Sequence, residues 1–291
     1  MQPTPEAYQA VQALVDVLDL ETIDDDLFRG RPSPNDRGRA FGGTVAAQAL
    51  VAAARSVDEG FWVHSMHSYF LLPGDPSAPI VYDVDRIRDG RSFLTRRVAA
   101  RQHGRPIYYQ TLNFHRHEEG YDHQDAMPEV VPPEKGLDIR TLMAQQIDPD
   151  GPATTEWDAL DVRAVGNSLM GLEPDPRRPA QQRSWMRIAA PLPDDPLLHV
   201  AAFTWASDLS LLSASLAAHT LEMDKVQMAS LDHSIWFHRP FKVDQWWLYD
   251  QESPSAQGGR GLSLGRVFTH DGVLAATVAQ EGIIRPPRHK D

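Results

Sequence analysis

One short run of the chain matches a nucleophile motif. Gly261-Leu262-Ser263-Leu264-Gly265 has the Gly-x-Ser-x-Gly spacing of serine hydrolases, and Asp271 and His289 follow it in the order of a catalytic triad. In those hydrolases the serine lies on a sharp turn between a strand and a helix. The run around Ser263 is predicted to be a strand, so we assign no serine nucleophile.

The residue spacing does not support metal or thiol chemistry. His64 with His67, and His115 with His117, form close pairs, but neither pair comes with a carboxylate or thiolate set at the spacing of metal ligands. The chain contains no cysteine, which excludes disulfides, thiolate metal sites and a cysteine nucleophile. We therefore expect no metal ion and no other cofactor.

Gln280 is an amide on a face that is otherwise apolar. In a strand over about 273–284, alternation puts it on one face with Leu274, Ala276, Val278 and Ile284. Burial of an unpaired amide costs about 1–3 kcal/mol, so Gln280 should have a polar partner. A buried glutamine that bonds to backbone is the structural alternative.

The sequence is an imperfect repeat, and its halves differ at a few polar positions. His67-Ser68-Tyr69-Phe70 with Pro73 and Tyr82 corresponds to His233-Ser234-Ile235-Trp236-Phe237 with Pro240 and Tyr249; Gly90-Arg91, Arg97-Val98 and Gly104 correspond to Gly259-Arg260, Arg266-Val267 and Gly272. By these offsets Gln280 corresponds to Leu112, Ser230 to His64, and Asp208 to the region of Gly42-Gly43. Folding alone explains such polar residues poorly, because the other half folds without them.

The elements that would position these residues also occur twice. Helices are predicted over 6–20, from about Gly42 and from about 195; strands are predicted near 61–72, 80–88, 92–102 and 106–116, and near 181–190, 226–239, 245–255, 260–270 and 273–284. Residues 118–180, rich in proline and acids, are predicted to be a linker with one short helix near 138–146. A helix along a curled antiparallel sheet, built twice, is an α+β architecture.

Composition limits the possible partners. The chain has 291 residues and a net charge of −12, which argues against sequence-independent binding to nucleic acid or to an anionic membrane surface. No apolar run approaches the ~18–20 residues of a membrane span. The first residues lack the basic and apolar regions of a signal peptide, and the last four are not a Ser-Lys-Leu-type peroxisomal signal. We predict a cytoplasmic protein with no nucleic-acid partner and no membrane insertion.

Three strings in the second half carry a family resemblance. Ala206-Ser207-Asp208, the run from Ala229 to Phe241 that contains Asp-His-Ser-Ile-Trp-Phe-His-Arg-Pro, and Gln280-Glu281-Gly282 closely resemble the acyl-CoA thioesterase II family. The likeness covers roughly 29–117 and 181–286. It implies a double hotdog fold, with an N-terminal half over 1–117, a linker over 118–180 and a C-terminal half over 181–291.

The resemblance also implies an activity and a site. Enzymes of this family hydrolyse fatty acyl-CoA thioesters to free fatty acid and coenzyme A, and their Asp, Thr or Ser, and Gln surround the attacking water. Those roles fall here on Asp208, Ser230 and Gln280. Asp208 would accept the water's proton, while Ser230 and Gln280 would hold the water at the attack angle.

Further parts of the site are open at this point. Backbone N–H groups near Gly42 and Gly43 are candidate oxyanion donors. His238 and Arg239 either contact coenzyme A phosphates or face solvent. Asp208 could instead cap a helix.

Other functions and the assembly state are also open. Asp232-His233 is a poor dyad, because adjacent strand residues point to opposite faces. A non-catalytic acyl-CoA binding or sensing protein and a hotdog enoyl-CoA hydratase are the alternative functions. Since hotdog sheets commonly pair edge to edge, we expect a homodimer or a higher even oligomer.

Overall fold

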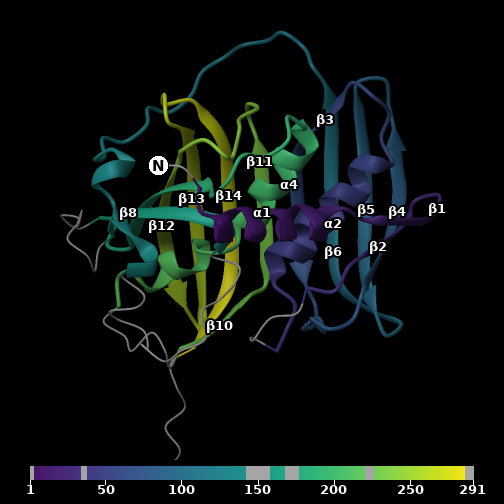
Figure 1. Ribbon diagram of the computed structural model, residues 1–291, viewed down its shortest axis with the longest axis horizontal. Coiled ribbons are helices and arrows are strands. Elements are labelled where there is room, and N and C mark those ends of the chain that lie inside the picture. The colour runs from purple at the N-terminus through teal and green to yellow at the C-terminus, as the bar shows by residue number, and fades with distance from the viewer. Residues whose placement is uncertain (1–2, 34–37, 142–157, 168–176, 220–225, 286–291) are drawn as a thin grey trace, which may run out of the picture.

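The computed structural model describes residues 3–33, 38–141, 158–167, 177–219 and 226–285. Its main feature is one long antiparallel sheet, with helices lying in front of its centre (Figure 1). The helices are α1 (Pro5–Leu18), α2 (Gly42–Arg55) and α4 (Pro196–Ser207), with 3-10 turns η1 (Pro133–Lys135) and η3 (Leu211–Leu216). The strands are β1 (Glu21–Asp24), β2 (Leu27–Gly30), β3 (Phe61–Phe70), β4 (Ile80–Asp89), β5 (Phe93–Gln102), β6 (Arg105–Arg116), β7 (Leu137–Asp138), β8 (Leu160–Asn167), β9 (Gln181–Ile188), β10 (Gln227–Ser230), β11 (Asp232–Phe237), β12 (Trp247–Gln257), β13 (Arg260–Thr269) and β14 (Leu274–Arg285).

The two halves have the same strand order and meet in the middle of the sheet. Read inward, the first half runs β4-β5-β6-β3 and the second runs β12-β13-β14-β11. The halves join where β3 pairs with β11, and His67 stands opposite Ser234 at this junction. This is the α+β double hotdog arrangement expected from the sequence.

Burial at the junction corrects the alignment of the two halves by one residue. Met66 and His233 are both fully buried, whereas His67 is exposed. Side chains alternate between faces along a strand, so His233 corresponds to Met66 and not to His67. The same offset separates Pro73 from Pro240. It also pairs Ser230 with Val63, and not with His64 as predicted.

Small residues allow the central helices to approach one another closely. Helix α2 is buried from Gly43 to Ala53. A Cβ atom at Gly43 would lie 2.4 Å from the carbonyl oxygen of Trp205 in α4, so this crossing requires a glycine.

The helical stretch Pro196–Leu216 is long and apolar enough to cross a membrane by length and composition alone, but 61% of its apolar window is buried inside the molecule. That burial is typical of a core helix.

The sequence prediction misses several short strands. Strands β1 and β2 form a hairpin that extends the sheet beyond β4. The segment predicted to be a linker contributes β7 and β8, and β8 pairs with β9. The strand predicted near 226–239 is divided at Leu231 into β10 and β11. The short helix predicted near 138–146 lies mostly outside the described residues.

The first part of the predicted linker lies along the surface of the second half. In Figure 1 this teal segment passes over the top of the sheet from β6. Trp185 donates a hydrogen bond from Nε1 to the carbonyl oxygen of Val131 at 2.8 Å, and Arg239 forms an ion pair with Asp122. These contacts fix the connection against β9 and the end of β11.

Candidate active site

Asp208 immediately follows helix α4. It is the C-cap residue, with φ −81° and ψ −16°, whereas its alignment with Gly42-Gly43 predicts a place near a helix start. The difference arises because the helical stretch begins at Pro196 and breaks at Asp208 before η3. An acidic group at a helix C-terminus is unfavourable by about 0.3–1 kcal/mol, so N-terminal capping does not explain this residue.

The structure brings Asp208, Ser230 and Gln280 together from three separate elements. The Gln280 amide donates from Nε2 to Asp208 Oδ1 at 2.5 Å and to Ser230 Oγ at 3.0 Å. The Ser230 hydroxyl in turn donates to Asp208 Oδ1 at 3.4 Å. Gln280 is fully buried, as its apolar strand face predicts, and its amide nitrogen has two polar partners.

Only one of the two carboxylate oxygens of Asp208 accepts these hydrogen bonds. Both donors, Gln280 Nε2 and Ser230 Oγ, are directed at Oδ1. The other oxygen, Oδ2, faces Gly42, where a Cβ atom would lie only 2.8 Å away from it. The carboxylate is thus held through one oxygen, while the second points toward the first half of the molecule.

The local strand geometry explains how Ser230 reaches Gln280. Ser230 is the last residue of β10 and pairs with Gly282 of β14, two residues beyond Gln280. Residues two apart on a strand share a face, so Ser230 lies next to the Gln280 side chain on the same surface. The break at Leu231 then lets the chain continue as β11.

Residues of the first half complete the surroundings of Asp208. Gly42 opens α2, and a Cβ atom there would also lie 2.9 Å from Cε1 of Phe70. Burial raises the pKa of Tyr108 on β6, and the negative charge of Asp208 acts in the same direction. The candidate site therefore lies between the halves. Of the two predicted oxyanion glycines, Gly42 lies beside Asp208, whereas Gly43 packs on Trp205.

The predicted coenzyme A contacts lie elsewhere. His238 and Arg239 follow β11 at the end opposite to Ser230. The His238 ring is 2.8 Å from Thr277 Oγ1, and Arg239 bonds the carbonyl oxygen of Leu274 at 2.9 Å. The structure does not bring this pair to the trio, and its contact with coenzyme A stays a prediction.

Sequence reasoning discounted His233 as part of a dyad and gave it no other role, but it lies close to the trio. Its Nε2 is 2.9 Å from the hydroxyl of Ser207, the residue before Asp208. Burial lowers the pKa of His233, and the charge of Asp208 opposes this effect. The corrected alignment supplies the missing signal, because its counterpart is Met66. The neighbouring carboxylate of Asp232 accepts from the Glu281 amide at 2.7 Å, outside the buried face, as the adjacent-residue argument expects.

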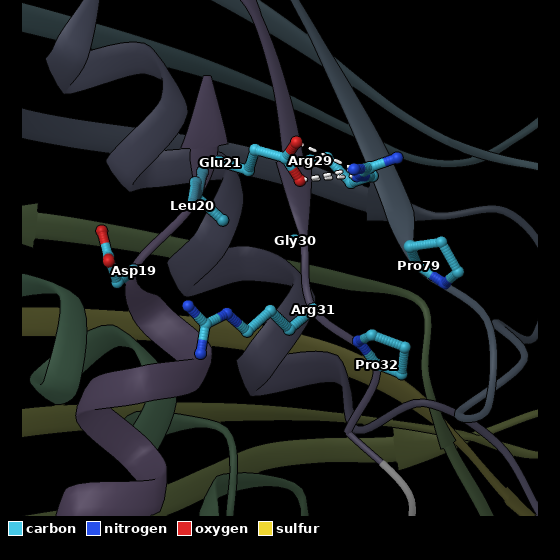
Figure 2. A pocket seen from close by; sticks show the side chains of 8 residues that line it. All are labelled: Asp19, Leu20, Glu21, Arg29, Gly30, Arg31, Pro32 and Pro79. Carbon is cyan, nitrogen blue, oxygen red and sulfur yellow. Dashed lines mark hydrogen bonds and ion pairs between the residues drawn. The ribbon is translucent and has the colours of Figure 1, made fainter. Parts of the chain in front are cut away.

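A surface hollow of about 580 Å³ lies away from this site (Figure 2). It is lined by residues from the end of α1, strands β1 and β2, and the segments beside them: Asp19, Leu20, Glu21, Arg29, Gly30, Arg31, Pro32 and Pro79. Arg29 and Glu21 are joined across it by an ion pair of 2.6 Å. None of the trio lines it. Within the described ranges, no group of three or more histidine and acidic side chains is placed to hold a metal ion.

Family models, individual protein sequences and a solved structure that are similar to this chain carry the description acyl-CoA thioesterase. The model of the family described as acyl-CoA thioesterase matches residues 158–283, and that of the acyl-CoA thioesterase N-terminal domain matches residues 31–115. The chain is 42% identical over 279 residues to human acyl-coenzyme A thioesterase 8, covering 92% of this chain and 88% of the relative. It is 38% identical over 281 residues to acyl-CoA thioesterase 2 of Haemophilus influenzae, covering 94% and 96%. The crystal structure of the acyl-CoA thioesterase II TesB2 from Mycobacterium marinum superposes with a TM-score of 0.82 at 44% identity, covering 94% of this chain and 98% of that one.

Proposed function

The chain belongs to the acyl-CoA thioesterase family and hydrolyses acyl-CoA thioesters, and we propose that Asp208, Ser230 and Gln280 form its catalytic site. One observation carries the proposal. Three polar side chains of the second half, from positions 208, 230 and 280, are joined by hydrogen bonds, beside Gly42 of the first half. The equivalent positions of the first half hold no such group, since Gln280 corresponds to Leu112 and Ser230 to Val63.

The geometry supports a division of roles within the trio. In place of the contact with the water that the resemblance implied, we propose that Gln280 and Ser230 fix Oδ1 of Asp208, which leaves Oδ2 to accept a proton from water. The water oxygen then bonds to the thioester carbonyl carbon while its proton moves to Oδ2. When the carbon–sulfur bond breaks, the sulfur leaves with the bond electrons and takes up that proton. The products are a free carboxylic acid and coenzyme A.

The negative charge that develops on the carbonyl oxygen also needs a donor. The first N–H groups of a helix have no partner within the helix, and they favour negative charge. Gly42 is the first residue of α2 and lies beside Oδ2 of Asp208, so its N–H is the proposed oxyanion donor. A crystal structure with a thioether analogue or product would test this, and a carbonyl oxygen that faced away from Gly42 would remove the assignment.

The substitution Asp208→Asn tests the trio directly. The variant keeps the shape of the side chain but removes the proton acceptor, so coenzyme A release should fall by ~100-fold or more. Release can be followed with a thiol reagent, because the enzyme has no cysteine to react. Asp271→Asn is the matched control, since Asp271 is exposed and its carboxylate accepts a hydrogen bond from the nearby Thr269 hydroxyl. Full activity in Asp208→Asn would refute the role of this carboxylate.

The acyl group, location and assembly state extend the proposal. We take the substrates to be fatty acyl-CoA thioesters, which a C4 to C18 acyl-CoA series would test, and the location to be cytoplasmic, which cell fractionation would test.

For assembly, edge-to-edge pairing already occurs inside the chain at β3 and β11. A homodimer or higher even oligomer would therefore use another surface. The exposed outer face of β3, β6 and β11 carries Tyr69, Tyr109 and Trp236 and is the surface we propose.

A further inference from the structure

The carbonyl end of the Gln280 side chain has no assigned partner. Its Nε2 uses both hydrogens on Asp208 and Ser230. Its Oε1 is buried and has no hydrogen-bond partner among the described residues. A buried carbonyl oxygen without a donor carries a substantial desolvation cost. A donor close to Oε1 would therefore determine how firmly the amide is held.

Two buried polar side chains flank Gln280 on the neighbouring strands. Ser263 of β13 stands directly opposite Gln280 in the register of β13 and β14. On the other side, Ser234 pairs with Ala279, which places His233 of β11 level with Gln280. All three side chains are fully buried, and Ser263 Oγ and His233 Nδ1 also lack partners among the described residues. Directly opposed strand residues have Cβ atoms about 4.5–5.5 Å apart.

The hydrogen-bond pattern shows which neighbour can donate. The Ser207 hydroxyl donates to the carbonyl oxygen of Thr204 at 2.9 Å, so it accepts from Nε2 of His233. His233 therefore carries its hydrogen on Nε2, and its Nδ1 is an acceptor. Burial lowers the pKa of His233 and disfavours the doubly protonated form. Of the two flanking side chains, Ser263 is the one with a free hydroxyl hydrogen.

We infer that Ser263 is a positioning residue for the hydrolysis, whose hydroxyl reaches Gln280 Oε1 by rotation about the Cα–Cβ bond of Ser263 or through one ordered water. The inference rests on the proposed function of Gln280. A bridging water would accept from Ser263 and donate to Gln280 Oε1 and His233 Nδ1, and three hydrogen bonds are usual for a buried water. Either arrangement keeps the Gln280 amide hydrogens directed at Asp208 and Ser230. The serine of the Gly-x-Ser-x-Gly run thus acts through Gln280 and not as a nucleophile.

A double-mutant cycle tests whether Ser263 acts through Gln280. Ser263→Ala should lower kcat about tenfold with little change in KM, because the acyl-CoA contacts remain but the amide is less well fixed. In the Gln280→Ala background, Ser263→Ala should cause no further loss, since residues that act as one unit are not additive. Ser263→Thr keeps the hydroxyl and should retain activity within about threefold of the wild type.

A matched control separates this role from a general loss of buried hydroxyls. Ser215 is also buried, and its hydroxyl donates to the carbonyl oxygen of Leu212 at 2.7 Å. Ser215→Ala should leave kcat unchanged, and circular dichroism should show folded protein for every variant.

The possible outcomes distinguish the inference from the proposal beneath it. Equal losses from Ser263→Ala in both backgrounds, or unchanged kcat in the wild-type background, would overturn the inference and leave the trio intact. Full activity of Gln280→Ala would instead overturn the role of Gln280 and the inference with it. An acyl group found on Ser263 by mass spectrometry after rapid quenching would show a nucleophile and also overturn the inference.

Discussion

At the scale of single residues, the second half differs from the first by a small set of buried polar groups. Gln280 could be predicted, because strand alternation placed an amide among apolar neighbours. His233 could not, because the repeated His-Ser dipeptide aligned it with His67, an exposed residue. Ser263 was noticed for its motif, but its position opposite Gln280 depends on strand register, which the sequence does not supply. The sequence alone therefore identified candidate polar residues, whereas the contacts between them could be known only from the folded structure.

The buried state of His233 leads to a prediction for stability. Because burial lowers its pKa below the ordinary value of 6.5, the unfolded chain binds a proton at this residue at higher pH than the native protein does. The free energy of unfolding should therefore fall as the pH drops below about 6.5, where the unfolded chain binds this proton and the native protein does not. His233→Met, which introduces the residue of the other half, should reduce the slope by up to about 1.4 kcal/mol per pH unit.

Urea unfolding at pH 5.5 and 7.5 would measure this change in slope. The His233→Met variant should keep part of the pH dependence, because burial also lowers the pKa values of His64 and His199. His219→Gln, at an exposed position, is the control. An identical difference between the two pH values in the wild type and His233→Met would contradict the prediction.

At the scale of elements, the long strands were predictable and the short ones were not. The strands from β3 to β6 fall close to the predicted ranges because alternation and Gly or Pro turn residues bound each of them. Strand β1 has only four residues, all exposed, so it carries no apolar pattern. Apolar and polar residues alternate in strand β8 only from Leu160 to Ala164, and the surrounding prolines and acids concealed this short pattern. Its stability comes from pairing with β9, a contact that a local pattern cannot show.

The crossing of α2 and α4 provides a prediction at this scale. A methyl group at Gly43 would meet the Trp205 carbonyl oxygen at 2.4 Å, and this backbone atom cannot move without shifting α4. Gly43→Ala should therefore lower the free energy of unfolding by about 1–3 kcal/mol, as overpacking does. Thermal unfolding would measure the loss. Gly120→Ala is the control, because a Cβ atom there meets nothing within 4 Å. A Gly43→Ala variant as stable as the wild type would mean that the helices can separate without cost.

At the scale of the whole molecule, duplication gives one chain the symmetry of a dimer. Because β3 and β11 are joined within the chain, the edges that two separate hotdog domains could pair are already used. The ends of the sheet are the short strands β1 and β7, which offer little backbone for further pairing. Because the proposed trio is present in one half only, we predict one catalytic site per chain, in a molecule whose framework is nearly twofold.

The surface that we propose for assembly is the outer face around that pseudo-twofold axis. Tyr69 and Trp236 lie on the two strands that meet there, and they are 64% and 39% exposed. A surface with approximate twofold symmetry can bind a copy of itself, because each contact is then made twice. We expect light scattering after size exclusion to give an even oligomer, and Tyr69→Glu with Trp236→Glu to shift it toward monomer by burying charge without a partner. Tyr121→Glu is the control, because the Tyr121 side chain in the predicted linker is fully exposed, and it should leave the mass of the oligomer unchanged. A wild-type monomer would refute the assembly, while an oligomer that survived the double substitution would move its interface to another surface.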